Sequence, residues 1–315
     1  MQLNVITRKS AMTAILLLVA IVVASVVRYV HTPFELELAD GAYRGGLIAL
    51  AAILLIYCGI IEGKMFSRSG LSAAYSTLSM PIYGVLACGV FVASNLLAAA
   101  AASLCFAVAL FLLLRSLHNA EEKDSVFFAS ILLGATALLY PPCVVLVAVL
   151  PIAIFTLALS LRQSMIMIVG YLLPIFVASY ITWYGGEPFL YFGETLVASL
   201  RESQMSAVGS VPYLAIAMVV AVIAILLWGM VYSIISPSKA FTLTRVRRAL
   251  HLFLWIFVFS LTILLIPACN LSACAVIAVP ATMLVSCVID ILPNNHSAIA
   301  YWVLLALFAT HLFVA

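Results

Sequence analysis

Charged residues are scarce in this sequence. Lysine, arginine, aspartate and glutamate together make up 8% of the 315 residues, whereas 67% are apolar and the mean hydropathy is +1.29. Soluble domains carry about 25% charged residues, so a water-soluble fold of this size would lack the polar side chains needed to cover its surface. The composition therefore excludes a soluble globular protein and predicts an integral membrane protein.

The motifs of soluble enzymes and of metal sites are also absent. The sequence contains no phosphate-binding loop, no GxSxG elbow, no HExxH pair and no GxGxxG turn. Its seven cysteines form no CxxC or Cys/His cluster and fall in or beside apolar runs, where cysteine packs as a small hydrophobe. We therefore identify no cofactor and no metal site, and the net charge of +3 does not indicate nucleic acid as a partner.

Long charge-free runs occupy most of the chain. In the central stretch Ser125–Gly186 the only charge is Arg162, and the Tyr140-Pro141-Pro142 segment cannot continue a helix normally, because proline lacks an N–H and restricts the residue before it. Since a spanning helix needs about 20 mostly apolar residues, the runs predict an all-α integral membrane bundle of about eleven transmembrane helices. The predicted spans are 10–27, 45–61, two within 69–114, 125–139, 142–161, 165–184, 212–235, two within 249–289, and a last one that ends at Ala315.

The distribution of basic residues predicts the orientation of this bundle. With a cytoplasmic N-terminus, eleven of the 14 Lys and Arg residues fall on the cytoplasmic side, as the positive-inside rule requires. The C-terminus is then external, and the first span is retained as a helix. We expect one multi-pass domain over residues 1–315 in the bacterial cytoplasmic (inner) membrane. It has external loops at 31–44 and 185–211, an interfacial helix in the second loop, and a basic cytoplasmic loop at 236–249.

The two external loops carry most of the candidate functional residues. Carboxylates there suit a divalent cation or a general base, and arginine suits a phosphate. The alternative is that these charges only solvate loops beside the membrane. No acidic residue is expected deep in a span, because Glu62 ends the second span and Asp290 closes the tenth, which argues against a proton- or sodium-coupled transporter. The loop charges are Glu35, Glu37, Asp40 and Arg44 in the first loop, and Glu187, Glu194, Arg201 and Glu202 in the second.

Three segments carry a resemblance to a known family. They are LLGATALLYPP (132–142), GYLLP (170–174) followed by TWYGG (182–186), and FVFSLTILLIP…AVIAVPATMLVSCVIDIL (257–292). The chain resembles a family of polytopic inner-membrane proteins of unknown function from Bacteroidetes. This resemblance implies a multi-pass membrane location and supplies no activity.

The order of spans and loops is also similar to the transmembrane modules of C-type glycosyltransferases, which use lipid-linked sugar donors. That resemblance implies a catalytic acid in the first external loop, at Asp40, Glu35 or Glu37. It also implies contact with a polyprenyl-phosphate-linked sugar through Arg44, Arg201 and Glu194. The chain departs from the pattern, since its first loop is short, the paired acidic motif is missing and no soluble domain follows.

Three classes of function remain open. A non-catalytic membrane component or scaffold in cell-envelope biogenesis is favoured, because no site stands out. The alternatives are a glycosyltransferase-like enzyme, or a relic of one, and a transporter of a lipid or small molecule. The expected partners are the lipid bilayer and either envelope-biogenesis proteins or a lipid-linked substrate.

Overall fold

The computed structural model describes most of the chain. It covers residues 10–31, 41–68, 77–87, 95–118, 123–189, 191–201, 212–235, 244–266, 269 and 272–314. Every regular element within these ranges is a helix, which confirms the predicted all-α class.

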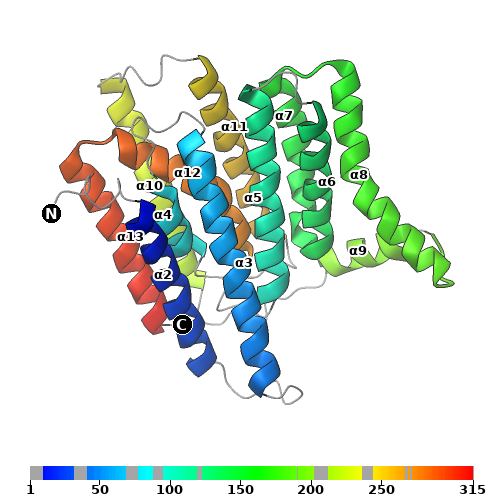
Figure 1. Cartoon of the computed structure of the whole chain (residues 1–315), viewed down its shortest axis with the longest axis horizontal. Coiled ribbons are helices and arrows are strands. Elements are labelled where there is room, and N and C mark those ends of the chain that lie inside the picture. The colour runs from blue at the N-terminus through cyan, green and yellow to red at the C-terminus, as the bar shows by residue number, and fades with distance from the viewer. Residues whose placement is uncertain are drawn as a thin grey trace.

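The helices form a single bundle (Figure 1). The first half of the chain contributes α2 (Ser10–His31), α3 (Gly41–Arg68), α4 (Ser79–Leu86), α5 (Leu96–His118), α6 (Lys123–Leu139), the 3-10 helix η2 (Pro141–Ala148) and α7 (Val149–Leu157). The second half contributes α8 (Leu161–Tyr184), α9 (Tyr191–Arg201), α10 (Pro212–Ile235), α11 (Thr244–Leu261), the 3-10 helix η5 (Thr262–Leu265), α12 (Ala273–Ile291) and α13 (Asn294–Val314).

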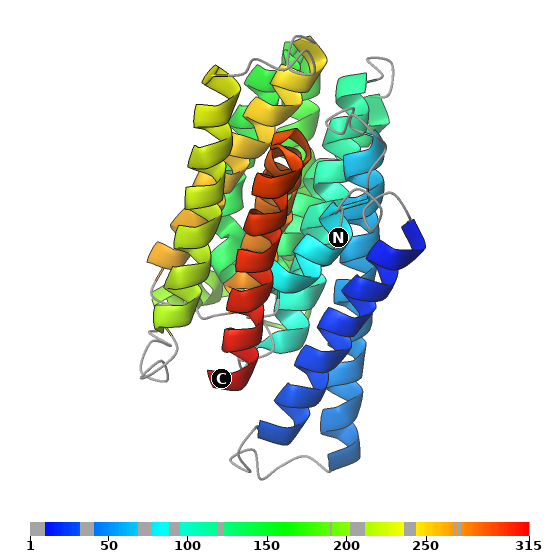
Figure 2. The same ribbon diagram turned by 90° about the vertical axis from the view of Figure 1, so that its left-hand side faces the viewer.

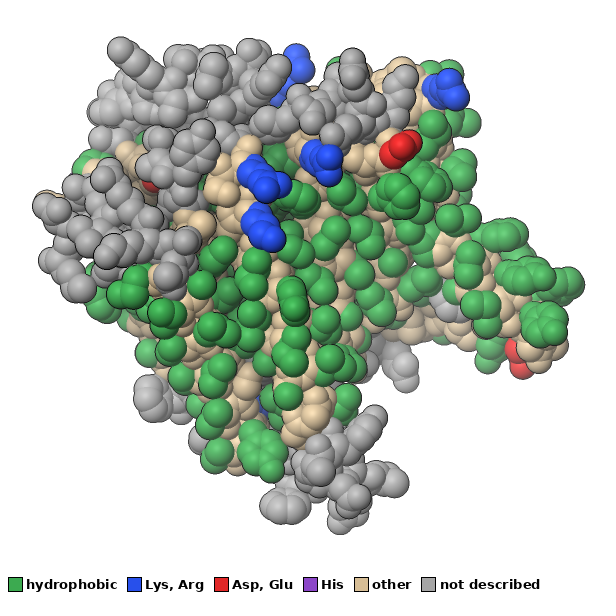
Figure 3. Space-filling view, viewed as in Figure 1, with side chains coloured by type: hydrophobic (Ala, Val, Ile, Leu, Met, Phe, Trp, Pro, Cys, Tyr) green, Lys and Arg blue, Asp and Glu red, His purple; other side chains and the backbone are tan. Residues whose placement is uncertain are grey.

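The lengths and surfaces of these helices are those of a membrane-embedded protein. Among the described residues, six helices are long and apolar enough to cross a membrane, and four shorter helices are also apolar. Large apolar side chains, such as Leu172, Phe176 and Ile181 of α8, lie exposed on the outside of the bundle (Figure 3). Soluble proteins rarely expose such extensive apolar surface, whereas lipid chains are its natural solvent.

Prolines and a helix cap mark the breaks in the central part of the chain. Helix α6 ends at Leu139, and η2 begins directly at Pro141, where the sequence predicts that a helix cannot continue. Helix α7 ends at Ala158, which adopts a left-handed conformation with φ of 49°. Ser160 then caps α8 in a reciprocal capping box with Gln163, so Arg162 lies in the first turn of α8.

Several boundaries differ from those predicted from the sequence. Helix α3 continues to Arg68, seven residues beyond the predicted end at Ile61. Helix α11 begins at Thr244, so the last part of the expected loop 236–249 is helical. The first of the two spans expected within 69–114 is described only as α4, which is eight residues long.

Helix α12 forms the centre of the bundle and α8 its edge. In its apolar stretch, 78% of the residues of α12 are buried inside the protein, compared with 22% for α8. Helix α12 contacts α3, α4, α5, α10, α11 and α13, whereas α8 packs mainly on α6. At the opposite side, α2 and α3 lie side by side and extend beyond the other helices (Figures 1 and 2).

Basic side chains gather at one end of the bundle, at the top in Figure 3. The exposed Lys and Arg residues of the described part belong to the end of α3, the end of α5 and the starts of α8 and α11. This arrangement matches the charge asymmetry expected from the sequence. These residues are Lys64, Arg68, Arg115, Arg162 and Arg248.

Candidate functional site

A fully buried carboxylate lies inside the bundle near its basic end. Glu62 of α3 is 0% exposed, and neither of its carboxylate oxygens has a hydrogen-bond partner among the described residues. It precedes Arg68, the last residue of α3, by six positions, or about 9 Å along a helix. A buried ionisable side chain in a membrane bundle costs free energy, so it is a candidate functional site by default.

The position of Glu62 within α3 explains its burial. Cys58, Met65 and Phe66 are also 0% exposed and share its face of the helix, at spacings of three and four residues. Lys64, on another face, is exposed. Glu62 therefore belongs to the buried face of α3, although it stands next to charged and polar residues in the sequence.

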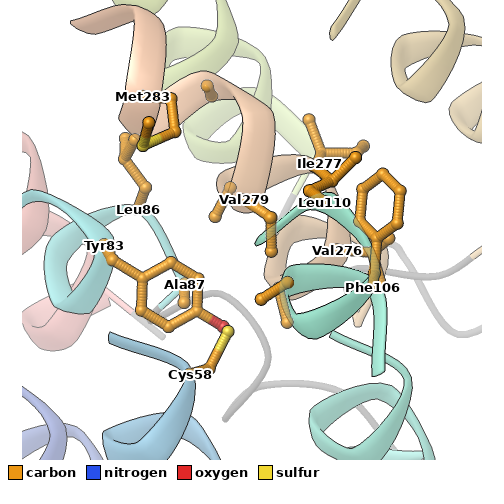
Figure 4. Close-up of a cluster of buried hydrophobic side chains, with 14 of the residues drawn as sticks. Cys58, Tyr83, Leu86, Ala87, Phe106, Leu110, Val276, Ile277, Val279 and Met283 are labelled. Atoms are coloured by element: carbon orange, nitrogen blue, oxygen red, sulfur yellow. The ribbon is translucent and has the colours of Figure 1, made fainter. Parts of the chain in front are cut away.

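A hydrogen-bonded polar group lies one turn before Glu62. The Tyr83 hydroxyl of α4 donates to Ser103 Oγ of α5 at 3.3 Å, and Ser103 Oγ donates to the Ala100 carbonyl at 2.8 Å. Cys58 Sγ donates to the Ser103 carbonyl at 3.6 Å, and Figure 4 shows its thiol beside the Tyr83 hydroxyl. These three buried side chains thus have polar partners, in contrast to Glu62.

Helices α3 and α4 pack closely and run antiparallel. A Cβ atom on Gly63 would lie 2.6 Å from Met80 Cγ, so the Met80 side chain of α4 packs directly against the backbone of α3. Cys58, which precedes Gly63 on α3, lies beside Tyr83, which follows Met80 on α4. These two contacts show that α3 and α4 run in opposite directions.

This antiparallel register places Ser79 at the level of Glu62. Ser79 precedes Tyr83 by one turn on α4, and Glu62 follows Cys58 by one turn on α3. Ser79 is 0% exposed, and its hydroxyl has no hydrogen-bond partner. Two unpartnered polar groups thus lie at a similar level of two helices that contact each other.

Helix α12 supplies two more unpartnered hydroxyls. Thr282 and Ser286 lie one turn apart, are 0% exposed and have no hydrogen-bond partner. Helix α12 contacts both α3 and α4, and Figure 4 shows Met283 beside Leu86 of α4. All four buried side chains without a polar partner in the described part of the chain therefore belong to three helices that contact one another. We call Glu62, Ser79, Thr282 and Ser286 the unpartnered cluster.

The residues predicted as a site in the external loops are only partly described. Glu35, Glu37 and Asp40 lie outside the described residues. Arg44 is in the first turn of α3, and Arg201 is the last residue of α9, but neither side chain is described. Glu194 is exposed in the first turn of α9, an amphipathic helix within the expected loop 185–211. The structure therefore does not test this set as a site.

Predicting spans from the lengths of charge-free runs did not identify the unpartnered cluster. Counting charge-free residues assigns Glu62 to the end of a span, because any charge closes the run. One signal in the sequence could have revealed the burial of Glu62. The apolar residues Met65 and Phe66 lie three and four positions after Glu62, so the apolar face that includes Cys58 continues beyond it. Thr282 and Ser286 give no comparable signal, because hydroxyls are common in membrane helices.

Comparison of the chain with protein-family models, with curated proteins and with solved structures found no significant match. Its class is defined by the fold alone: a helical membrane protein with a buried carboxylate inside the bundle.

Proposed function

We propose that this protein is a carrier of the bacterial cytoplasmic membrane that moves a lipid or small molecule and couples the movement to a cation or proton at Glu62. The observation that carries the proposal is the fully buried Glu62 carboxylate, which has no polar partner in the described part of the chain. An ionised carboxylate in this position costs several kcal/mol, because the side chain is fully buried and no described basic group pairs with it. Two neutral forms avoid that cost, the protonated acid and the cation-bound carboxylate.

Exchange between these forms is what coupling requires. When the site opens to water, the carboxylate releases its proton or cation, and when the site closes, one of the neutral forms is favoured. A purely structural carboxylate has no reason to remain unpartnered, because an apolar side chain would fill the same position at lower cost. Three further buried hydroxyls without a polar partner, on α4 and α12, belong to helices that contact α3.

We expect Glu62 to react with dicyclohexylcarbodiimide, an apolar reagent that modifies protonated carboxyl groups inside membranes. Peptide mass spectrometry of the full-length protein in membranes should locate the adduct at Glu62. The exposed Glu187, in the turn after α8, serves as the internal control and should stay unmodified, because an apolar reagent concentrates inside the membrane rather than at an exposed turn. If saturating reagent leaves Glu62 unmodified even in a buffer whose only monovalent cation is choline, the carboxyl group does not take up a proton when no metal cation is present, and the carrier proposal is wrong.

The proposal includes the predicted topology of eleven spans, with a cytoplasmic N-terminus and an external C-terminus. Two observations support it. The described helices occupy the predicted segments in order, and the exposed basic residues gather at one end. A reporter fused after Ala315 should therefore be active only outside the cytoplasm. A cytoplasmic reporter at this position would contradict the odd number of spans.

The other two functions predict different critical residues. A glycosyltransferase-like enzyme, or a relic of one, requires the acids of the loop 31–44 and Arg201 rather than Glu62. The amphipathic helix α9 supports that alternative by its position after α8. A scaffold for envelope biogenesis requires none of these side chains individually, so its function should survive each single substitution.

A further inference from the structure

We propose that η2 and η5 form a hinge at the end of the bundle opposite the basic one, and that η2 moves by changing between 3-10 and α-helical geometry. This inference rests on the proposed carrier function, because a carrier must open and close at each end. Helices α8 and α11 begin at the basic end. Helix α11 leads away from that end to η5, and α7 leads from η2 to the start of α8, so both 3-10 segments lie at the other end, where they contact each other.

The length of η2 is unusual for a 3-10 helix. It spans eight residues, whereas such segments rarely exceed three or four, because their hydrogen bonds are poorly aligned. Ala148 and Val149 both adopt right-handed helical angles, so α7 follows η2 without a break. One apolar segment, 141–157, thus consists of a 3-10 part and an α part. A 3-10 stretch inside a longer helix often marks a functional hinge.

The sequence explains why η2 is not α-helical. In an α-helix the Val147 carbonyl would accept from the N–H of residue 151, but Pro151 has no N–H, and its ring crowds that carbonyl. The Val149 N–H donates instead to the Leu146 carbonyl, three residues earlier. The three valines of η2 also lower its helix propensity. Pro151 therefore removes a hydrogen bond from the α form of η2, which brings the 3-10 form into competition with it.

Conversion of η2 would displace its first residues. The rise per residue is about 2.0 Å in a 3-10 helix and about 1.5 Å in an α-helix, so eight residues shorten by about 4 Å on conversion to α. The other end of the segment is held by the left-handed Ala158 and by the capping box of Ser160, which fix the turn between α7 and α8. The displacement therefore falls on Tyr140 and Pro141.

Three contacts would transmit this displacement to other segments. Tyr140, directly before η2, is hydrogen-bonded to Cys269, which follows η5. Helix α11 continues into η5, whose cap Ile266 is extended, as expected for a residue before proline. The 3-10 helix η2 contacts η5 directly and also contacts the amphipathic helix α9, which lies at the same end of the bundle (Figure 1). A change in the length of η2 would therefore shift η5 and α9 together.

Hydrogen exchange of the purified full-length protein tests the hinge without any substitution. Amides exchange when their hydrogen bonds open locally, so a segment that changes geometry exchanges faster than a rigid one. Mass spectrometry of peptides should show that the amides of η2 exchange at least about tenfold faster than those of the central helix α12.

Pro151→Ala is the variant that should lock the hinge, because alanine supplies the missing N–H and removes the ring. Pro151 is exposed, so this change leaves the buried side chains in place. We expect exchange of the η2 amides to slow at least about tenfold, and complementation of a strain that lacks the protein to be lost at normal protein abundance. Pro174→Ala, which removes a proline from inside α8, is the matched control and should complement normally.

The hinge is contradicted by any of three results. The first is equally slow exchange of η2 and α12 in the unaltered protein, which would make η2 a rigid element. The second is unchanged exchange of η2 in Pro151→Ala, and the third is normal complementation by a variant whose η2 is protected. None of them affects the carrier proposal, which depends on the modification of Glu62 by carbodiimide. Failure of that modification would overturn the carrier and the hinge together.

Discussion

Replacing Glu62 by leucine is expected to raise the thermal stability of the protein while abolishing its function in the cell. Leucine removes a buried carboxyl group without a polar partner and fills its place with apolar atoms, which should stabilise the fold by roughly 1–3 kcal/mol. Loss of the carboxyl group removes the group on which the proposed coupling depends. The measurements are the melting temperature in detergent and complementation of a strain that lacks the protein.

Two controls make this result specific. Glu62→Gln keeps the size of the side chain and should also lose function, whereas Glu187→Gln removes an exposed carboxylate and should retain it. If Glu62→Leu lowers both stability and function, Glu62 has a structural role. If Glu62→Leu complements normally and Asp40→Asn or Arg201→Ala does not, the glycosyltransferase-like alternative replaces the carrier. Normal complementation by all of these variants favours the scaffold.

Gly134→Val is expected to disrupt the packing of α8 on α6. A Cβ atom at Gly134 would collide with the Tyr171 carbonyl oxygen of α8 and lie 3.2 Å from Pro174 Cγ. The carbonyl belongs to a helical backbone and cannot rotate away, so the helices must separate. Overpacking typically costs about 1–3 kcal/mol, and α8 has few other contacts to compensate. The melting temperature and the yield of monodisperse protein should both fall.

Gly46→Val is the matched control for this substitution. Gly46 also lies in a helix, α3, but a Cβ atom there would meet nothing within 4 Å. Both variants carry the same cost of valine in a helix, so the difference between them reports the helix contact alone. Gly170→Val should behave like Gly134→Val, because its Cβ would meet Ser130 and Phe127 of α6. Equal melting temperatures for the variants at Gly134 and Gly46 would contradict the described packing.

Much of the fold can be predicted from the sequence, because prolines and charges mark where apolar helices end. The predicted span 212–235 coincides with α10, and the break at Pro141 occurs as expected. Helix α8 begins four residues before the predicted Met165, since Ser160 and Gln163 form a cap that charge counting does not register.

The candidate site could not be predicted from the sequence, because only the packing of the helices shows that its residues are buried and lack polar partners. Glu62 follows an apolar run in the same way as any charge at the end of a span. Its burial depends on Gly63, which admits α4, and on the two apolar residues that follow. Ser79 and Ser286 are more than 200 positions apart, and no local pattern brings them together.

The central place of α12 has a consequence for biosynthesis. This helix begins at Ala273 and covers faces of α3, α4 and α5, which leave the ribosome much earlier. During synthesis those helices enter the membrane before α12 covers them, and contacts between such distant parts of a chain form slowly. A chain whose synthesis stops before residue 273 therefore lacks α12, the central helix of the bundle, rather than a peripheral helix. Such a product is expected to depend on insertion factors or to be degraded.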